Sequence, residues 1–414
     1  MPTDPEGEIV TAGSAERATF GQVFALSEFR ALWAAQMLSV AGDQLARVAL
    51  TWLVYERTHS ALLAAVTFVA SIVPTFVGGI VLSGLGDRLP RRRVMIACDL
   101  IRAALVAVMA LPGLPVMVLV VLLFLVTMVG APFTSARAAV YPDILAGDRY
   151  VLGSAITLTT FQFAQVIGFA LGGTIVGVFG VRTSLIADAV TFLGSAAIVR
   201  AWVRARPPAQ VASHGRRAAI SGLRSGARLV ATHPALRTPM LLGWLAAFYD
   251  APEGVAAPLA RTLGGGSATV GLLLASGALG SVLGALTFSR LVDPRARQRW
   301  MIPLAVLTSG VLAAFYLRPE LPFALLILTT SGVFSCFQLA ANAAFVRAAP
   351  PAERSQAFGL AQGGMNLGQG TLMVLAGAAA ERLAPAVVIA SSGVLGVIAA
   401  AAVAFSWSRG RLLA

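Results

Sequence analysis

Residues 61–93 read ALLAAVTFVASIVPTFVGGIVLSGLGDRLPRRR, a long apolar run that ends in a short, strongly basic loop. The run exceeds the roughly 20 apolar residues that a helix needs to cross about 30 Å of hydrocarbon. Similar runs, separated by short polar links, follow one another along the chain. Because 57% of the 414 residues are hydrophobic and only 12% are charged, the usual charged soluble surface cannot be built, and the apolar side chains must face lipid.

About twelve runs reach spanning length, so the sequence predicts an all-α membrane protein. Several links are so short that consecutive helices must be antiparallel neighbours. The spans are expected at residues 32–54, 61–85, 94–112, 115–138, 151–178, 183–203, 239–260, 268–289, 300–317, 321–346, 356–380 and 384–407.

A polar stretch at residues 204–238 interrupts the apolar pattern and divides the spans into two equal sets. We therefore expect an N-terminal bundle at 29–203, a C-terminal bundle at 239–407, and polar tails at 1–28 and 408–414. The stretch between the bundles predicts either an amphipathic helix along the inner leaflet or a solvated linker helix. Its apolar residues recur at nearly helical spacing, at Ala219, Ile220, Leu223, Ala227, Leu229 and Val230.

The distribution of arginine predicts the orientation in the membrane. All 31 basic residues are arginine, and short cytoplasmic loops retain basic residues. The loops on the side of the N-terminus hold most of them, whereas the opposite loops hold one each, at Arg57, Arg182, Arg261, Arg318 and Arg382. This asymmetry predicts a multi-pass protein of the inner or plasma membrane with both termini in the cytoplasm. The net charge of +13 is then a topology signal rather than a sign of nucleic-acid binding.

The sequence lacks the residue types and spacings that common nucleotide-binding and metal sites need. A Walker loop requires lysine, and the chain has none. His59, His214 and His233 lie in loops without zinc-site spacing. Cys98 and Cys336 lie in separate apolar runs, which supports neither a disulfide nor a cysteine metal site. We expect no enzyme activity, cofactor or metal.

The loop after the second span resembles a known signature. Leu85, Asp87 and Arg88 match Gly-x-Leu-x-Asp-Arg-x-Gly-Arg-Arg of the major facilitator superfamily, while Ser83 and Pro90 replace its two glycines. The resemblance implies two pseudo-symmetric six-helix bundles that rock against each other. It also implies a cytoplasmic gate in which Asp87 approaches Arg354 at the start of the eleventh helix. The expected gate residues are Leu85, Gly86, Asp87, Arg88, Arg91, Arg92 and Arg354.

Other stretches resemble the bacterial drug and siderophore exporters of that superfamily, of the enterobactin and macrolide efflux type. They are residues 29–33 with 39–44, residues 137–143, and residues 354–359. The fifth span also resembles the family's antiporter motif, because it keeps Gly168, Gly172 and Gly173 and has Phe169 in place of the motif's proline. These small residues suit close helix packing.

Ionisable residues within the spans are candidates for function because burying a charge in a membrane is costly. Asp43 lies near the middle of the first span, and Arg47 follows one turn later on the same face. An ion pair between them, or a shared water-filled cavity, is geometrically easy. Asp43 is therefore a candidate for proton coupling, for structural ion pairing or for contact with substrate.

The seventh span contains Asp250 and Glu253, three residues apart and therefore on one face. They are candidates for binding protons or substrate, or they lie in water at the mouth of a cavity, because Pro252 can kink the helix there. Arg137 matches a position where the family often has a basic residue implicated in proton handling. Its alternative role is to cap the fourth span and pair with Asp143 or Asp148.

Neutral polar and aromatic residues in the spans are expected to line a substrate cavity or to hold helices together. Trp244, Phe248 and Tyr249 give the seventh span aromatic side chains suited to a lipophilic ligand or to packing. The polar candidates are Gln36, Gln162, Gln165, Gln338, Asn342, Gln362, Asn366 and Gln369.

These features predict a secondary transporter, with proton-coupled efflux of a small lipophilic or siderophore-like compound as the expected activity. Its partners would be a small-molecule substrate, protons and the lipid bilayer, with no nucleic acid, and it would function as a monomer. An importer or facilitator of the same fold is the alternative. A scaffold or sensor that does not transport is a third hypothesis, but it would gain nothing from burying Asp43, Asp250 and Glu253.

The orientation can be tested with single cysteines introduced at Arg93 and Arg318 after Cys98 and Cys336 are replaced. In intact cells, a membrane-impermeant thiol reagent should label position 318 and leave position 93 unlabelled, because the basic loop stays in the cytoplasm. Labelling of position 93 from outside would overturn the predicted topology.

Overall fold

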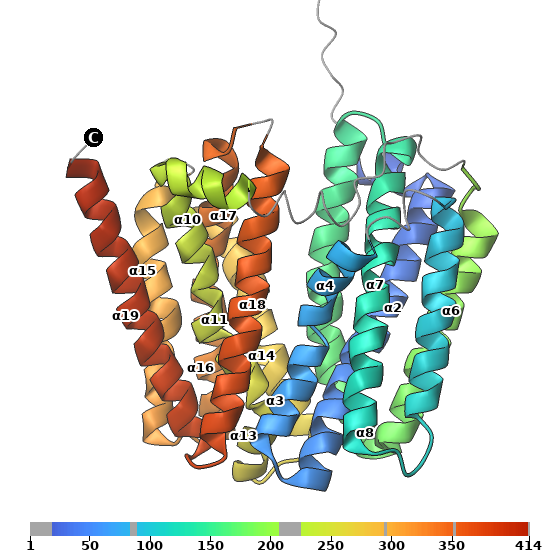
Figure 1. Ribbon diagram of the computed structural model, residues 1–414, viewed down its shortest axis with the longest axis horizontal. Coiled ribbons are helices and arrows are strands. Elements are labelled where there is room, and N and C mark those ends of the chain that lie inside the picture. The colour runs from blue at the N-terminus through green and yellow to red at the C-terminus, as the bar shows by residue number, and fades with distance from the viewer. Residues whose placement is uncertain (1–18, 83–88, 207–224, 294–295, 351–352, 413–414) are drawn as a thin grey trace, which may run out of the picture.

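The computed structural model describes residues 19–82, 89–206, 225–293, 296–350 and 353–412, and these ranges contain helices and connecting turns without β-strands. Figure 1 shows two groups of helices side by side, the N-terminal half in blue to green and the C-terminal half in yellow to red. The long helices of both groups lie with their axes roughly parallel (Figure 1). The all-helical, two-bundle architecture is therefore as the sequence predicts.

The N-terminal half begins with the short helix α1, which precedes the first spanning helix. The expected spans from 32–54 to 183–203 all overlap its helices, and α8 combines two of them. Its elements are α1 (Phe20–Phe24), α2 (Ser27–Thr58), α3 (Ala61–Ala70), α4 (Val73–Val81), α6 (Arg91–Met109), α7 (Val116–Ile144) and α8 (Asp148–Trp202).

The helix α8 reverses direction at Gly180, whose φ of 80° and ψ of 166° are not helical. This left-handed φ favours glycine because a Cβ would clash with the backbone. The expected boundary between the fifth and sixth spans, at residues 178–183, coincides with this turn.

The C-terminal half contains the spans expected from 239–260 to 384–407. Its elements are α10 (Pro234–Trp244), α11 (Ala246–Tyr249), α12 (Ala251–Gly254), α13 (Ala256–Thr262), α14 (Ser267–Leu291), α15 (Arg297–Gly310), the 3-10 helix η1 (Val311–Leu317), α16 (Leu321–Phe334), α17 (Phe337–Ala348), α18 (Arg354–Ala380) and α19 (Pro385–Leu412). The expected kink in the seventh span is present as breaks between α10 and α13, where Pro252 and Pro258 lack the amide hydrogens that a continuous helix uses.

The helices differ in whether their length and mean hydropathy suit a membrane span. By length and mean hydropathy alone, seven stretches of the described chain qualify as membrane spans. Those that fall short include α2, α6, the broken segment α10–α13, and α18. These four carry many of the polar residues within the predicted spans, so their polar faces need shelter from lipid inside the protein.

The two halves contact each other at the end where α2 stops and α14 begins. The backbones of Gly173 in α8 and Gly271 in α14 approach so closely that a Cβ on either would overlap the other. Gly377 in α18 likewise packs against Ala61 and Ala65 of α3. Toward the opposite end, where α8 ends at Trp202 and α19 ends at Leu412, the two groups of helices diverge (Figure 1).

The described part of the linker packs against protein. Residues 225–232 are helical, and Leu229 and Val230 are buried in one cluster with Met240 and Phe345 of the C-terminal half. These two apolar residues of the linker therefore face neighbouring helices of the C-terminal half. Ala219, Ile220 and Leu223 lie outside the described residues.

A polar contact also joins the halves at the closed end. The Glu381 carboxylate, beyond the end of α18, accepts hydrogen bonds from the Ser60 hydroxyl at 2.6 Å and from the Leu62 backbone amide at 2.8 Å. Ser60 precedes α3, whose first amides lack partners within the helix. The bond from Ser60, followed by that from Leu62, lowers the pKa of Glu381 below its ordinary value of 4.5.

This contact should make closure at this end depend on pH. Because the carboxylate form is favoured while the contact exists, its contribution is present above pH 4.5 and is lost as the pH falls through the lowered pKa. Glu381→Gln should widen the distance between spin labels placed at this end of the two halves already at neutral pH. Electron spin resonance distance measurements check this outcome.

Glu320→Gln is the matched control, because Glu320 is an exposed acid at the start of α16 on the same side. It should leave the distances of the parent protein unchanged. Equal distances in the Glu381 and Glu320 variants at neutral pH would show that Glu381 does not hold this end closed.

Candidate transport cavity and buried charge network

A cavity of about 510 Å³ lies between the halves. This volume is within the range of small-molecule sites. The N-terminal half contributes Phe161, Gln162 and Gln165 from α8. The C-terminal half contributes most of the polar wall, including Tyr249, Asp250, Glu253, Gln362 and Gln369. Both expected glutamines of the fifth span and both expected acids of the seventh span thus face one cavity.

The broken segment α10–α13 presents the two acids to this cavity. Asp250 follows α11, and Glu253 lies within the four-residue helix α12. The Gln369 side-chain amide donates a hydrogen bond of 2.5 Å to Asp250 Oδ2. Among the described residues neither acid has an arginine within 4.0 Å. This part of the cavity can therefore attract a positive charge.

A second cavity, of about 300 Å³, lies in the N-terminal half. Phe161 lines both cavities, so they adjoin each other. The second cavity is lined by three residues expected from the sequence to handle protons, and by Gln36. The three are Asp43, Arg47 and Arg137.

Arg47 connects the two cavities electrostatically. It donates a hydrogen bond of 3.2 Å to the Ser71 backbone carbonyl, and its guanidinium lies near the rings of Phe68 and Phe169. Glu253 in the C-terminal half is the strongest attractive charge that acts on it, ahead of Asp43. A charge that enters the central cavity will therefore compete with Arg47 for Glu253.

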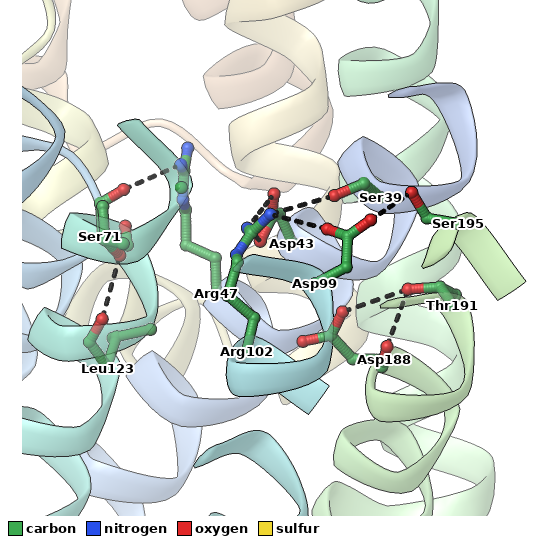
Figure 2. A network of polar contacts seen from close by, with 12 residues as sticks. Ser39, Asp43, Arg47, Ser71, Asp99, Arg102, Leu123, Asp188, Thr191 and Ser195 are labelled. Atoms are coloured by element: carbon green, nitrogen blue, oxygen red, sulfur yellow. Dashed lines mark hydrogen bonds and ion pairs between the residues drawn. The ribbon is translucent and has the colours of Figure 1, made fainter. Parts of the chain in front are cut away.

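Asp43 forms its ion pair with Arg102 rather than with Arg47. The Arg102 guanidinium contacts both carboxylate oxygens of Asp43, at 2.6 and 2.9 Å (Figure 2). The expected Asp43–Arg47 pair is therefore wrong, whereas the alternative of a shared cavity agrees with the structure. Helical spacing placed Arg47 near Asp43, but α6 brings a second arginine closer from the side.

Sequence reasoning missed the centre of this network. Arg102 and Asp99 lie one turn apart on α6 and are buried, and Asp188 on α8 is buried beside them. Asp99 accepts a hydrogen bond of 2.6 Å from Ser195, and Arg102 also bonds Ser39 at 3.2 Å (Figure 2). The sequence does mark Asp99, Arg102 and Asp188 as candidates, because each is an ionisable residue inside an apolar run.

Arg137 has a different environment from the one expected of a capping residue. Its guanidinium lies 5.9 Å from the Tyr141 ring centroid, and its Nε has no hydrogen-bond partner among the described residues. Asp143, one of its two expected partners, instead pairs with Arg91 at 2.7 Å and lies 3.9 Å from Arg206. The pairing of Arg137 with Asp143 is therefore wrong.

The expected cytoplasmic gate is described only in part. Leu85, Gly86, Asp87 and Arg88 lie outside the described residues. Arg91 and Arg92 bind their own half, through Asp143 and through the Arg200 backbone carbonyl. Arg354 is exposed at the first residue of α18. The approach of Asp87 to Arg354 stays a prediction.

Of the remaining candidates, some line a cavity and others pack against neighbouring helices. Trp244, Gln338, Asn342 and Gln362 line a third cavity, of about 310 Å³, in the C-terminal half. Phe248 instead packs in the cluster with α15 and α19, so the three aromatic residues of the seventh span do not share one face. Gln338 donates hydrogen bonds to Tyr249 and to the Gly243 carbonyl and so joins α17 to the seventh span, whereas the bond from Gln362 to Asn366 lies within α18.

The three glycines of the fifth span allow close packing on two sides. A Cβ at Gly168 or Gly172 would contact α2 at Gln44 or Leu45, within the N-terminal half. Gly173 instead faces α14 of the other half. The motif therefore positions α8 against both its own bundle and the closed end between the halves.

Two helical halves that meet at one end around a polar cavity are the architecture of a secondary transporter. The comparisons with known proteins agree. The chain belongs to the transmembrane secretion effector family of the major facilitator superfamily, whose family pattern matches residues 21–409. It is a multi-pass membrane transporter of small molecules and not an enzyme.

Two curated relatives are similar over most of the chain. The multidrug efflux pump Tap of Mycolicibacterium fortuitum is 27% identical over 312 residues, covering 72% of this chain and 75% of Tap. The enterobactin exporter EntS of Shigella boydii serotype 4 (strain Sb227) is 26% identical over 292 residues, covering 68% and 67%.

Solved structures share the fold at low sequence identity. A POT family transporter in complex with 5-aminolevulinic acid superposes with a TM-score of 0.73 at 10% identity, covering 94% of this chain and 97% of that chain. A bacterial homologue of the iron transporter ferroportin gives 0.63 at 14% identity, covering 93% and 99%. These likenesses confirm the major facilitator fold.

The energetic importance of Arg102 can be tested by comparing two arginines. Arg102→Gln leaves buried carboxylates without their cation and should destabilise the protein by about 3–5 kcal/mol. Arg91→Gln removes a partly exposed pair and should cost below about 1 kcal/mol. Thermal unfolding of the purified protein in detergent measures both. A loss for Arg102→Gln no greater than that for Arg91→Gln would contradict the network's role.

Proposed function

We propose that this transporter exports a small lipophilic compound carrying a basic amine, in exchange for protons, and that it works as a monomer. The observation that carries the proposal is the central cavity, in which Asp250 and Glu253 lie among amide and aromatic side chains. Buried carboxylates of this kind attract either a proton or an organic cation, which gives the two ligands a common site to compete for.

The direction of transport is proposed from topology and family. If the linker and termini are cytoplasmic, the end at which the halves diverge faces the cytoplasm (Figure 1). The conformation described would then admit substrate from inside the cell. The two curated relatives are an efflux pump and an exporter by name, which supports export over the importer of the same fold.

The acidic lining favours a cationic substrate over an anionic siderophore-like one. Gln162, Gln165 and Gln362 can accept or donate hydrogen bonds to the uncharged part of such a molecule. Phe161 and Met365 add apolar surface beside them. A wall that mixes amides, aromatic rings and a thioether tolerates ligands of differing shape.

Uptake into inverted membrane vesicles tests this proposal. With an imposed proton gradient, the lipophilic cation ethidium and a basic macrolide should accumulate, and collapsing the gradient should abolish accumulation. Glu253→Gln should lower the apparent affinity for ethidium about tenfold, the equivalent of ~1.4 kcal/mol from one charge contact. Asp43→Asn should reduce the dependence on the gradient.

Glu56→Gln is the control, because Glu56 is an exposed acid near the end of α2 and away from the cavity. It should transport ethidium as the parent protein does. Accumulation that persists after the gradient collapses would contradict proton exchange. Transport of the anionic siderophore enterobactin without transport of either cation would contradict the proposed substrate class.

A further inference from the structure

Asp188 differs from the other acids of the network in lacking a cation of its own. Its side chain is 1% exposed. Its Oδ1 accepts only a long hydrogen bond of 3.3 Å from Thr191 Oγ1, on the same helix. Its Oδ2 has no hydrogen-bond partner among the described residues. An ionised carboxylate held in this way would be strongly destabilised by the loss of hydration.

The nearby arginine is already engaged. Arg102 acts on Asp188 electrostatically, but it forms its ion pairs with Asp43, at 2.6 Å, and with Asp99, at 3.9 Å. The face of its guanidinium lies 4.0 Å from the centre of the Phe192 ring. Three carboxyl groups therefore share one guanidinium inside the N-terminal half, and at least one of them is better accommodated as a neutral acid.

The sequence makes room for the Asp188 carboxyl group. A Cβ at residue 42 would overlap both Asp188 Oδ1 and Thr191 Oγ1, so Gly42 on α2 is required where this carboxyl group packs. Asp43 follows Gly42 directly on α2, and its carboxylate acts electrostatically on Asp188. Asp99 and Arg102 face the site from α6 (Figure 2). Asp188 also forms part of the wall of the second cavity, together with Asp43 and Arg47, which gives water a route to it.

We propose that Asp188 is the proton carrier of the N-terminal half, neutral in the conformation described, and that Arg102 moves from Asp43 to Asp188 once Asp188 has ionised. In the proton-releasing step, the O–H bond of the Asp188 acid breaks and the proton passes to water in the second cavity. The guanidinium of Arg102 then pairs with the new carboxylate, while Asp43 is freed to take up a proton. This inference rests on the proposed function in assuming that protons drive transport.

The protonation of Asp188 can be tested without any transported substrate. In a background carrying Asp250→Asn and Glu253→Gln, which removes the carboxyl groups of the central cavity, an infrared difference spectrum between neutral and alkaline pH should show the loss of a protonated-carboxyl stretching band that shifts in heavy water. Asp188→Asn keeps the shape and neutrality of the acid, so it should fold normally but lack that band. Asp99→Asn is the matched control and should retain it, because Asp99 has Ser195 and Arg102 as partners.

Transport in reconstituted vesicles tests the coupling. Asp188→Asn should retain exchange of ethidium between two pools at equal pH, and should lose at least tenfold of the accumulation driven by a proton gradient. Glu56→Gln, which changes an exposed acid near the end of α2, should retain that accumulation. A purely structural Asp188 would change both activities together.

The two experiments separate failure of this inference from failure of the proposed function. Retention of the infrared band in Asp188→Asn, or undiminished gradient-driven accumulation by that variant, would overturn the inference. If the parent protein shows no gradient-driven transport, the proposed proton exchange fails. The infrared result then decides alone whether Asp188 holds a proton.

Discussion

Burying charge inside a membrane is the constraint on which this structure depends. Each ionisable group within the spans needs a partner, a proton or water. The helices that are too polar to pass as lipid-facing spans, α2, α6, the segment α10–α13 and α18, bring their polar faces to the cavities. The remaining helices supply an apolar exterior, with residues such as Val178, Phe179 and Leu317 exposed. The arrangement of the helices follows from placing polar faces at the cavities and apolar faces toward lipid.

The same constraint couples the halves to one another. Arg47 of the N-terminal half and Glu253 of the C-terminal half act on each other across the central cavity, while glycine contacts and the Glu381 carboxylate join the halves at one end. The central charges can be neutralised by each other, by protons or by a ligand, and the three choices favour different distances between the halves. Coupling of a ligand to movement requires such a differential interaction.

Much of the fold could be predicted from the sequence. Long apolar runs form helices, and the glycines and prolines between or within them form turns and breaks, without depending on distant parts of the chain. The turn at Gly180 and the breaks around Pro252 lie where the sequence predicts them. The site was harder to predict, because it is made by contacts between helices. Asp43 and Arg47 share a helical face, yet Asp43 pairs with Arg102, which is 59 positions away along the chain. Spacing along one helix cannot reveal which neighbouring helix brings the stronger partner, but ionisable residues inside apolar runs, such as Asp99 and Asp188, mark where to look.

We infer that the two halves alternately close at opposite ends around the charged cavity. Spin labels at Glu56 and Glu320 would report on the end that is closed in this structure, and labels at Arg149 and Arg354 would report on the other. All four positions are exposed. As the pH or the ethidium concentration is varied, one distance should lengthen while the other shortens. Distances that stay fixed at both ends, or that change in the same direction, would contradict it.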